Sequence, residues 1–126
     1  MPEDTPNVER FIRDEIDSVP HLEALLLLWR NAPNSWSGSQ LATHLYIHDG
    51  QGNVIAEDLH RRGLIARDNS GAFFYDTSRA ELNELVQAVD ETYRRELIRI
   101  SGIIHSKASP GIRAFADAFR FRREKS

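Results

Sequence analysis

The spacing of apolar residues predicts two amphipathic helices near the N-terminus. Over residues 8–17 the apolar side chains fall on one side of a helix. A break follows, and Pro20 suits the first turn of a second helix, where its missing N–H is not needed. Over residues 21–30, leucines and a tryptophan recur at steps of three and four, with further leucines between them. This second helix is therefore expected to be buried over much of its circumference.

The segment from residue 36 to residue 75 predicts helix, turn, helix and then a β-hairpin. Ser37 is a suitable N-cap for the first of these helices, and Gly63 is the expected left-handed residue after the second. A polar loop separates two short runs of β-forming residues, which is typical of a hairpin. The expected bounds are 38–45 and 53–62 for the helices, and 64–67 and 72–75 for the strands.

A long amphipathic helix is predicted after the hairpin. Ser78 is its expected N-cap, and apolar residues follow at steps of three or four as far as about His105. At 1.5 Å per residue such a helix would reach roughly 40 Å, which is longer than a compact domain of this size can cover. Its apolar face therefore needs a partner. A last helix is expected to start at Ser109 and Pro110.

Composition indicates a single globular domain over residues 1–126 and excludes several kinds of site. The chain is 40% hydrophobic and 28% charged, which is typical of a folded protein. It has no cysteine, so disulfides, thiolate zinc sites and cysteine catalysis are excluded. The longest apolar run is far too short to span a membrane, and the acidic N-terminus lacks the features of a signal peptide. A cytoplasmic protein without a membrane partner is expected.

Two stretches of the helix-turn-helix region resemble a known family. Residues 40–45, QLATHL, resemble the first helix of a helix-turn-helix, and residues 57–67, EDLHRRGLIAR, resemble the end of its second helix and the entry to a wing. The pattern of leucine, polar residues and then Gly-Leu-Ile is similar to that of winged helix-turn-helix transcriptional regulators of the multiple-antibiotic-resistance-regulator (MarR) class. The glycine lets the chain reverse sharply, and the two apolar residues then pack the first strand of the wing on the core.

The resemblance implies a mainly α fold with a small β-wing. The winged-helix core would cover residues 19–76, and the flanking helices, 8–17 and 78–123, would form a homodimer. Two recognition helices would then lie about 34 Å apart and enter successive major grooves of double-stranded DNA. The function implied is transcriptional regulation, with no catalysis and no cofactor.

The resemblance also implies a set of DNA-binding residues on or near the recognition helix. Gln51 and Asn53 would read adenine edges, whereas Arg61, Arg62 and Arg67 would contact phosphate. The implied set is Gln51, Asn53, Val54, Glu57, Arg61, Arg62 and Arg67.

The acidic character of this region keeps a second function open. Glu57 and Asp58 lie in the second helix, no lysine or arginine occurs between Trp36 and His60, and the net charge of the chain is −3. Neutralisation of phosphates supplies most non-specific affinity for DNA. The alternative is therefore a winged-helix adaptor that binds a protein partner instead of DNA.

Other candidate chemistry is sparse. His44 and His48 have the i, i+4 spacing of metal ligands on a helix, but residues 47–50 are expected to leave the helix, so no metal site is predicted. Adjacent carboxylates point to different faces of a helix and make no acid–base pair. The chain has no nucleophile motif and no phosphate-binding glycine loop, so no catalytic residue is predicted. A regulator that senses a metal or a small molecule is a third hypothesis.

Overall fold

The computed structural model describes residues 4–107 of the chain, and their side chains from residue 7 onward. The elements in this range are α1 (Asp4–Glu15), α2 (Val19–Arg30), α3 (Gly38–Leu45), α4 (Asp49–Arg61), β1 (Ala66–Arg67), β2 (Phe73–Phe74), α5 (Ala80–Arg95) and α6 (Leu97–Ser106). The predicted fold class, mainly α with a small β-wing, is confirmed. The helix predicted from Ser109 lies outside the described residues, as does the end of the flanking segment 78–123.

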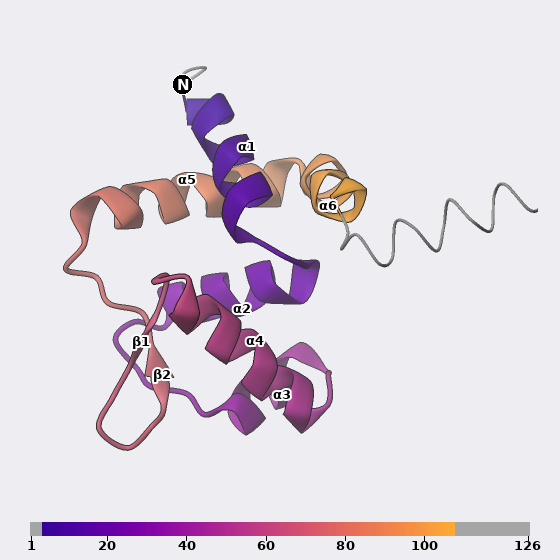
Figure 1. Cartoon of the computed structure of the whole chain (residues 1–126). Helices are drawn as coiled ribbons and strands as arrows, with labels where there is room; N and C mark the ends of the chain where they lie inside the picture. Colours follow the sequence, from indigo (N-terminus) through magenta and orange to yellow (C-terminus); the bar gives the residue numbers. More distant parts are fainter. Residues whose placement is uncertain (1–3, 108–126) are drawn as a thin grey trace, which may run out of the picture.

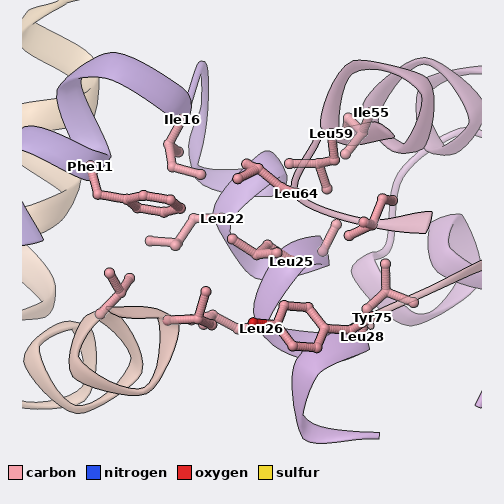
Figure 2. Close-up of a cluster of buried hydrophobic side chains, with 14 of the residues drawn as sticks. Phe11, Ile16, Leu22, Leu25, Leu26, Leu28, Ile55, Leu59, Leu64 and Tyr75 are labelled. Carbon is pink, nitrogen blue, oxygen red and sulfur yellow. The ribbon is translucent and has the colours of Figure 1, made fainter. Parts of the chain in front are cut away.

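Helix α2 lies at the centre of the fold. In Figure 1, α5 runs along one side of α2, and α3 and α4 lie on the other side. The α2 leucines at positions 22, 25, 26 and 28 are fully buried, and Figure 2 shows them between residues of α1 and residues of α4 and the wing. This burial confirms that α2 is covered over much of its circumference. Its N-cap is Ser18, whose hydroxyl oxygen accepts a hydrogen bond from the backbone N–H of His21.

Helices α3 and α4 meet backbone to backbone. A β-carbon on Gly52 of α4 would overlap the carbonyl oxygen of Gly38 and would lie 2.9 Å from the Cβ of Ala42. The glycines at positions 50 and 52 had suggested a turn over residues 48–52, yet α4 already begins at Asp49. The prediction of its start was wrong because Gly52 serves this close helix contact rather than a turn.

The wing is a short antiparallel pair in which Ala66 is opposite Phe74 and Arg67 is opposite Phe73. The backbone of Trp36 exchanges two hydrogen bonds with Phe73, at 2.7 and 2.8 Å, and so extends the pairing on the other edge. Both strands are shorter than predicted. The reason at β1 is that Leu64, buried in the core, closes the end of α4 by donating its N–H to the carbonyl oxygen of Leu59 at 3.0 Å.

The loop of the wing is organised by Asp68. Its carboxylate accepts hydrogen bonds from the N–H groups of Ser70 and Ala72, at 2.9 and 3.0 Å, and from the hydroxyl of Ser70 at 2.7 Å. Hydrogen bonds to serine hydroxyls are the main cause that lowers the pKa of Asp68 to about 2. Gly63 and Gly71 have left-handed backbone at the two ends of the wing, with φ of 78° and 91°, as expected for glycine at sharp reversals.

The long helix predicted from Ser78 to about His105 is in fact two helices. Helix α5 has its N-cap at Arg79 and ends at Arg95, and Glu96, with φ −132° and ψ 49°, turns the chain before α6. The prediction was wrong because apolar residues keep recurring every three or four positions on both sides of Glu96, so their spacing does not reveal the break. The turn brings α6 back onto α1, where Ile100 and Ile104 are buried.

Polar contacts hold α6 on α1. The Nη1 group of Arg99 donates to Oε1 of Glu9 at 2.6 Å, and Nζ of Lys107 donates to the backbone carbonyl of Ile12 at 2.9 Å. At the start of α6, however, Leu97 and Ile98 stay 50% and 84% exposed. The apolar surface that needs a partner is therefore smaller than the sequence suggested, and it lies at this corner.

Tyr75, directly after β2, is fully buried, and its hydroxyl has no hydrogen-bond partner among the described residues. Desolvation raises the pKa of this hydroxyl to about 12. A buried polar group without a partner costs about 1–3 kcal/mol, so Tyr75→Phe is expected to raise the free energy of unfolding by about 1 kcal/mol. Urea denaturation followed by circular dichroism measures this change.

Tyr93 provides the matched control, because its hydroxyl donates to Oε2 of Glu23 at 2.6 Å. Tyr93→Phe is expected to lower the free energy of unfolding by about 1.5 kcal/mol, the usual contribution of a hydrogen bond to a charged group. A loss of stability in Tyr75→Phe would mean that the hydroxyl of Tyr75 has a partner after all.

Candidate nucleic-acid interface

One face of α4 is open to solvent and carries most of the residues that the sequence proposed. Gln51, Asn53, Val54, Glu57 and Arg61 are all exposed. The opposite face of the helix is buried through Gly52, Ile55, Ala56 and Leu59. Val54, in the middle of this face, is apolar and yet 59% exposed.

The two amide side chains near the start of α4 also stabilise the helix-turn-helix. Oε1 of Gln51 accepts a hydrogen bond from the backbone N–H of His48 at 3.1 Å, which satisfies a donor at the helix N-terminus. This contact uses the amide oxygen and leaves the amide NH2 of Gln51 as a donor for another molecule. The side chain of Asn53 lies against Gly38, because a β-carbon there would overlap it. The side chain of Gln51 is therefore held in place before any ligand binds.

The cations of this surface are paired with the acidic residues of α4. Arg61, whose side chain is 72% exposed, forms an ion pair with Asp58. Arg67 of the wing forms an ion pair with Glu57 at 2.5 Å, and its guanidinium lies 4.7 Å from the ring centroid of Phe73. The Glu57–Arg67 pair joins α4 to β1 of the wing.

Arg62 lies apart from these residues. Its Nη1 donates to the backbone carbonyl of Asp14 at 2.9 Å, and its Nη2 donates to Oδ1 of Asp17 at 2.8 Å. The same Nη1 lies 3.5 Å from Oε1 of Glu15. The structure therefore turns this arginine toward α1 and the residues that follow it, whereas Arg61 and Arg67 pair with acidic residues of α4.

Comparison with known proteins identifies the fold. Neither a protein-family model nor a curated protein sequence matches the chain. Among solved structures, MepR, a transcription regulator of the Staphylococcus aureus multidrug efflux pump MepA, is 14% identical with a TM-score of 0.53, over 98% of this chain and 89% of its own. A MarR family protein from Bacillus stearothermophilus is 16% identical with a TM-score of 0.52, over 98% and 85% of the two chains. A Mycobacterium tuberculosis MarR family protein is 18% identical with a TM-score of 0.52, over 92% and 88%.

The chain has the MarR-type winged-helix fold. The resemblance inferred from sequence is thereby confirmed at the level of the fold. In this MarR-type architecture α3 and α4 form the helix-turn-helix, and the β1–β2 hairpin is the wing. No helix among residues 4–107 has both the length and the apolar character needed to cross a bilayer.

Sequence reasoning missed a polar cluster behind α4, the second helix of the helix-turn-helix. Oδ2 of Asp58 lies 2.9 Å from Nε2 of His21, and Nδ1 of that imidazole lies 2.6 Å from the hydroxyl of Ser18. Asp58 therefore connects α4 to the start of α2. No spacing rule connects two residues that are 37 positions apart, so the sequence offered no signal for this contact.

The same cluster is the one place among the described residues where metal-ligand atoms gather. Ligand atoms of Asp17, His21 and Asp58 lie within 4.8 Å of one another. Both carboxylates already pair with arginines, Asp17 with Arg62 and Asp58 with Arg61. Ion pairing thus accounts for these side chains. The two histidines considered for metal binding lie elsewhere. His48 is the N-cap of α4, and the ring of His44 makes an edge-on contact with the ring of Trp36, with 4.7 Å between the centroids.

Proposed function

We propose that the chain is a DNA-binding transcriptional regulator that acts as a homodimer and carries out no catalysis. The observation that carries this proposal is the exposed polar face of α4, which the Glu57–Arg67 ion pair joins to the wing. A helix with one open polar face has the width to enter the major groove of DNA, and a wing beside it reaches the adjacent backbone. The MarR-type fold supports the same conclusion.

Each residue of this face has a chemistry that suits a part of DNA. The amides of Gln51 and Asn53 match the N6 and N7 groups of adenine, and the carboxylate of Glu57 can accept a hydrogen bond from N4 of cytosine. The methyl groups of Val54 suit contact with the methyl group of thymine. Arg61 and Arg67 would bind phosphates on either side of the groove.

The acidic residues of α4 fit this proposal because they hold the two arginines in the absence of DNA. When phosphate arrives, Arg61 leaves Asp58 and Arg67 leaves Glu57. For Arg62, a phosphate contact remains a prediction: its guanidinium would first have to leave the backbone carbonyl of Asp14 and the carboxylate of Asp17.

The exposed corner at the start of α6 supports the homodimer. Leu97 and Ile98 are neighbouring apolar residues that are 50% and 84% exposed to solvent in the single chain. A second copy of the chain that covers this corner through a two-fold axis would bury both pairs at once. The same symmetry would place two α4 helices about 34 Å apart along one face of the duplex.

Selection from a random-sequence duplex library tests both parts of the proposal. The purified full chain is incubated with the library at about 50 mM salt, and bound duplexes are amplified and sequenced. We expect enriched inverted repeats with half-sites about 10 base pairs apart, since a two-fold dimer requires this symmetry. Enrichment of single half-sites would contradict the homodimer. No enrichment by a folded protein would contradict DNA binding and would favour the protein-binding adaptor.

A further inference from the structure

Tyr46, in the turn between α3 and α4, has an unfavourable backbone conformation. Its φ and ψ are 59° and 44°, and it is the one residue other than glycine with positive φ among residues 4–107. A β-carbon crowds the backbone in this left-handed region, so glycine or asparagine is usual at the end of a helix. The other two positions with positive φ in this range, Gly63 and Gly71, follow that rule.

Packing within the chain does not explain why a tyrosine occupies this position. Its side chain is 95% exposed, so it buries almost no apolar surface. Only its backbone takes part in the turn, where its N–H donates to the carbonyl oxygen of Ala42. A glycine would make the same hydrogen bond without the crowding. The phenol ring therefore points to a use outside the chain.

The surroundings of Tyr46 indicate what that use is. The turn directly precedes His48 and Asp49, where α4 begins, so Tyr46 lies beside the end of α4 that would enter the groove first. The exposed residues of α3 are Ser39, Gln40, Thr43 and His44, and no lysine or arginine lies between Trp36 and His60. Contact with the DNA backbone at this point therefore depends on donors other than lysine and arginine, and the hydroxyl of Tyr46 is one of them.

We propose that Tyr46 contacts the sugar–phosphate backbone at the edge of the major groove, an inference that rests on the proposed DNA-binding function. The hydroxyl donates a hydrogen bond to a phosphate oxygen, and the ring covers the neighbouring deoxyribose. A neutral donor does not replace a counterion on DNA. Tyr46 thus contributes affinity for any sequence without adding to the salt dependence, unlike an arginine.

Fluorescence anisotropy with a labelled mixed-sequence 30-base-pair duplex, across about 50–200 mM NaCl, tests this inference on the full chain. Tyr46→Phe removes only the hydroxyl, once in each subunit of the proposed dimer, and is expected to weaken binding about 25-fold, as the loss of two hydrogen bonds predicts. Tyr46→Gly removes the ring as well and is expected to weaken binding about 50-fold or more. The slope of log affinity against log salt should stay unchanged in both variants.

Thermal unfolding of the same variants separates a DNA contact from a structural role. Tyr46→Gly is expected to raise Tm by about 3 °C, because it removes the crowding of the left-handed backbone. A more stable variant that binds DNA more weakly would support the proposal. A lower Tm, or unchanged affinity in both variants while the native chain binds, would overturn it and leave the proposed function intact. Absence of binding by the native chain would overturn both.

Discussion

Alanine in place of Gly52 is expected to lower the free energy of unfolding by about 3 kcal/mol or to prevent folding. The added methyl group would overlap the carbonyl oxygen of Gly38 and press on Ala42, so α3 and α4 would have to move apart. Extra methyl groups in a filled contact usually cost about 1–3 kcal/mol, and here the neighbour is backbone, which cannot change rotamer. Urea denaturation followed by circular dichroism measures the loss.

Gly50 offers the matched control within the same helix. A β-carbon at Gly50 would meet no atom within 4 Å, so the same substitution adds no contact there. Gly50→Ala is expected to raise the free energy of unfolding by about 0.5 kcal/mol, since alanine loses less backbone entropy than glycine on entering a helix. If Gly52→Ala were stabilising as well, the close contact between α3 and α4 would not be the reason for a glycine at position 52.

The double variant Arg61→Ala/Arg67→Ala is expected to lose at least about 100-fold in DNA affinity at 0.1 M salt. A dimer presents each of these arginines twice, and four neutralised phosphates give a slope of log affinity against log salt of about −3.6. The double variant should show a slope close to zero. It also leaves Glu57 and Asp58 without their arginine partners beside the DNA. Anisotropy titrations at several salt concentrations measure both quantities.

The control for this variant removes the same charge elsewhere. Arg13→Ala/Arg95→Ala takes the net charge from −3 to −5, since −3 − 2 = −5, as Arg61→Ala/Arg67→Ala does. Both of these arginines are exposed, on α1 and α5, and α5 lies on the other side of α2 from α4 in Figure 1. The salt slope should be unchanged, with less than about a 3-fold loss of affinity. An equal loss in the two double variants would show that overall charge, rather than the surface of α4 and the wing, governs binding.

Most helices could be predicted from the sequence because buried apolar residues recur at the period of the helix backbone. The leucines of α2, the N-cap at Ser37 and the left-handed Gly63 all follow local rules, and the structure has each of them where it was expected. The start of α4 was missed because glycine is typical of turns and also of close helix contacts. The end of α5 was missed because one residue, Glu96, redirects the chain without a change in apolar spacing.

The candidate site was accessible from sequence only as a list of residues on one helix face. Asp58 and Arg61 pair within one helix, but the acids that pair with Arg62 and Arg67 depend on tertiary structure. Arg62 and Asp17 are 45 positions apart, so nothing local distinguishes Arg62 from Arg61 beside it. The exposure of Tyr46 and its left-handed backbone likewise emerge only once α3 and α4 are packed together.

The ion pairs of Arg61 with Asp58 and of Arg67 with Glu57 have a kinetic consequence under the proposed function. A regulator with unpaired arginines adheres to every stretch of a chromosome and spends most of its time on the wrong sequences. Here each phosphate must displace a carboxylate before it is bound, so random DNA releases the protein quickly. A sequence whose base edges match α4 adds contacts that delay this release. The carboxylates of α4 would thereby shorten the search for an operator, by reducing residence time everywhere else.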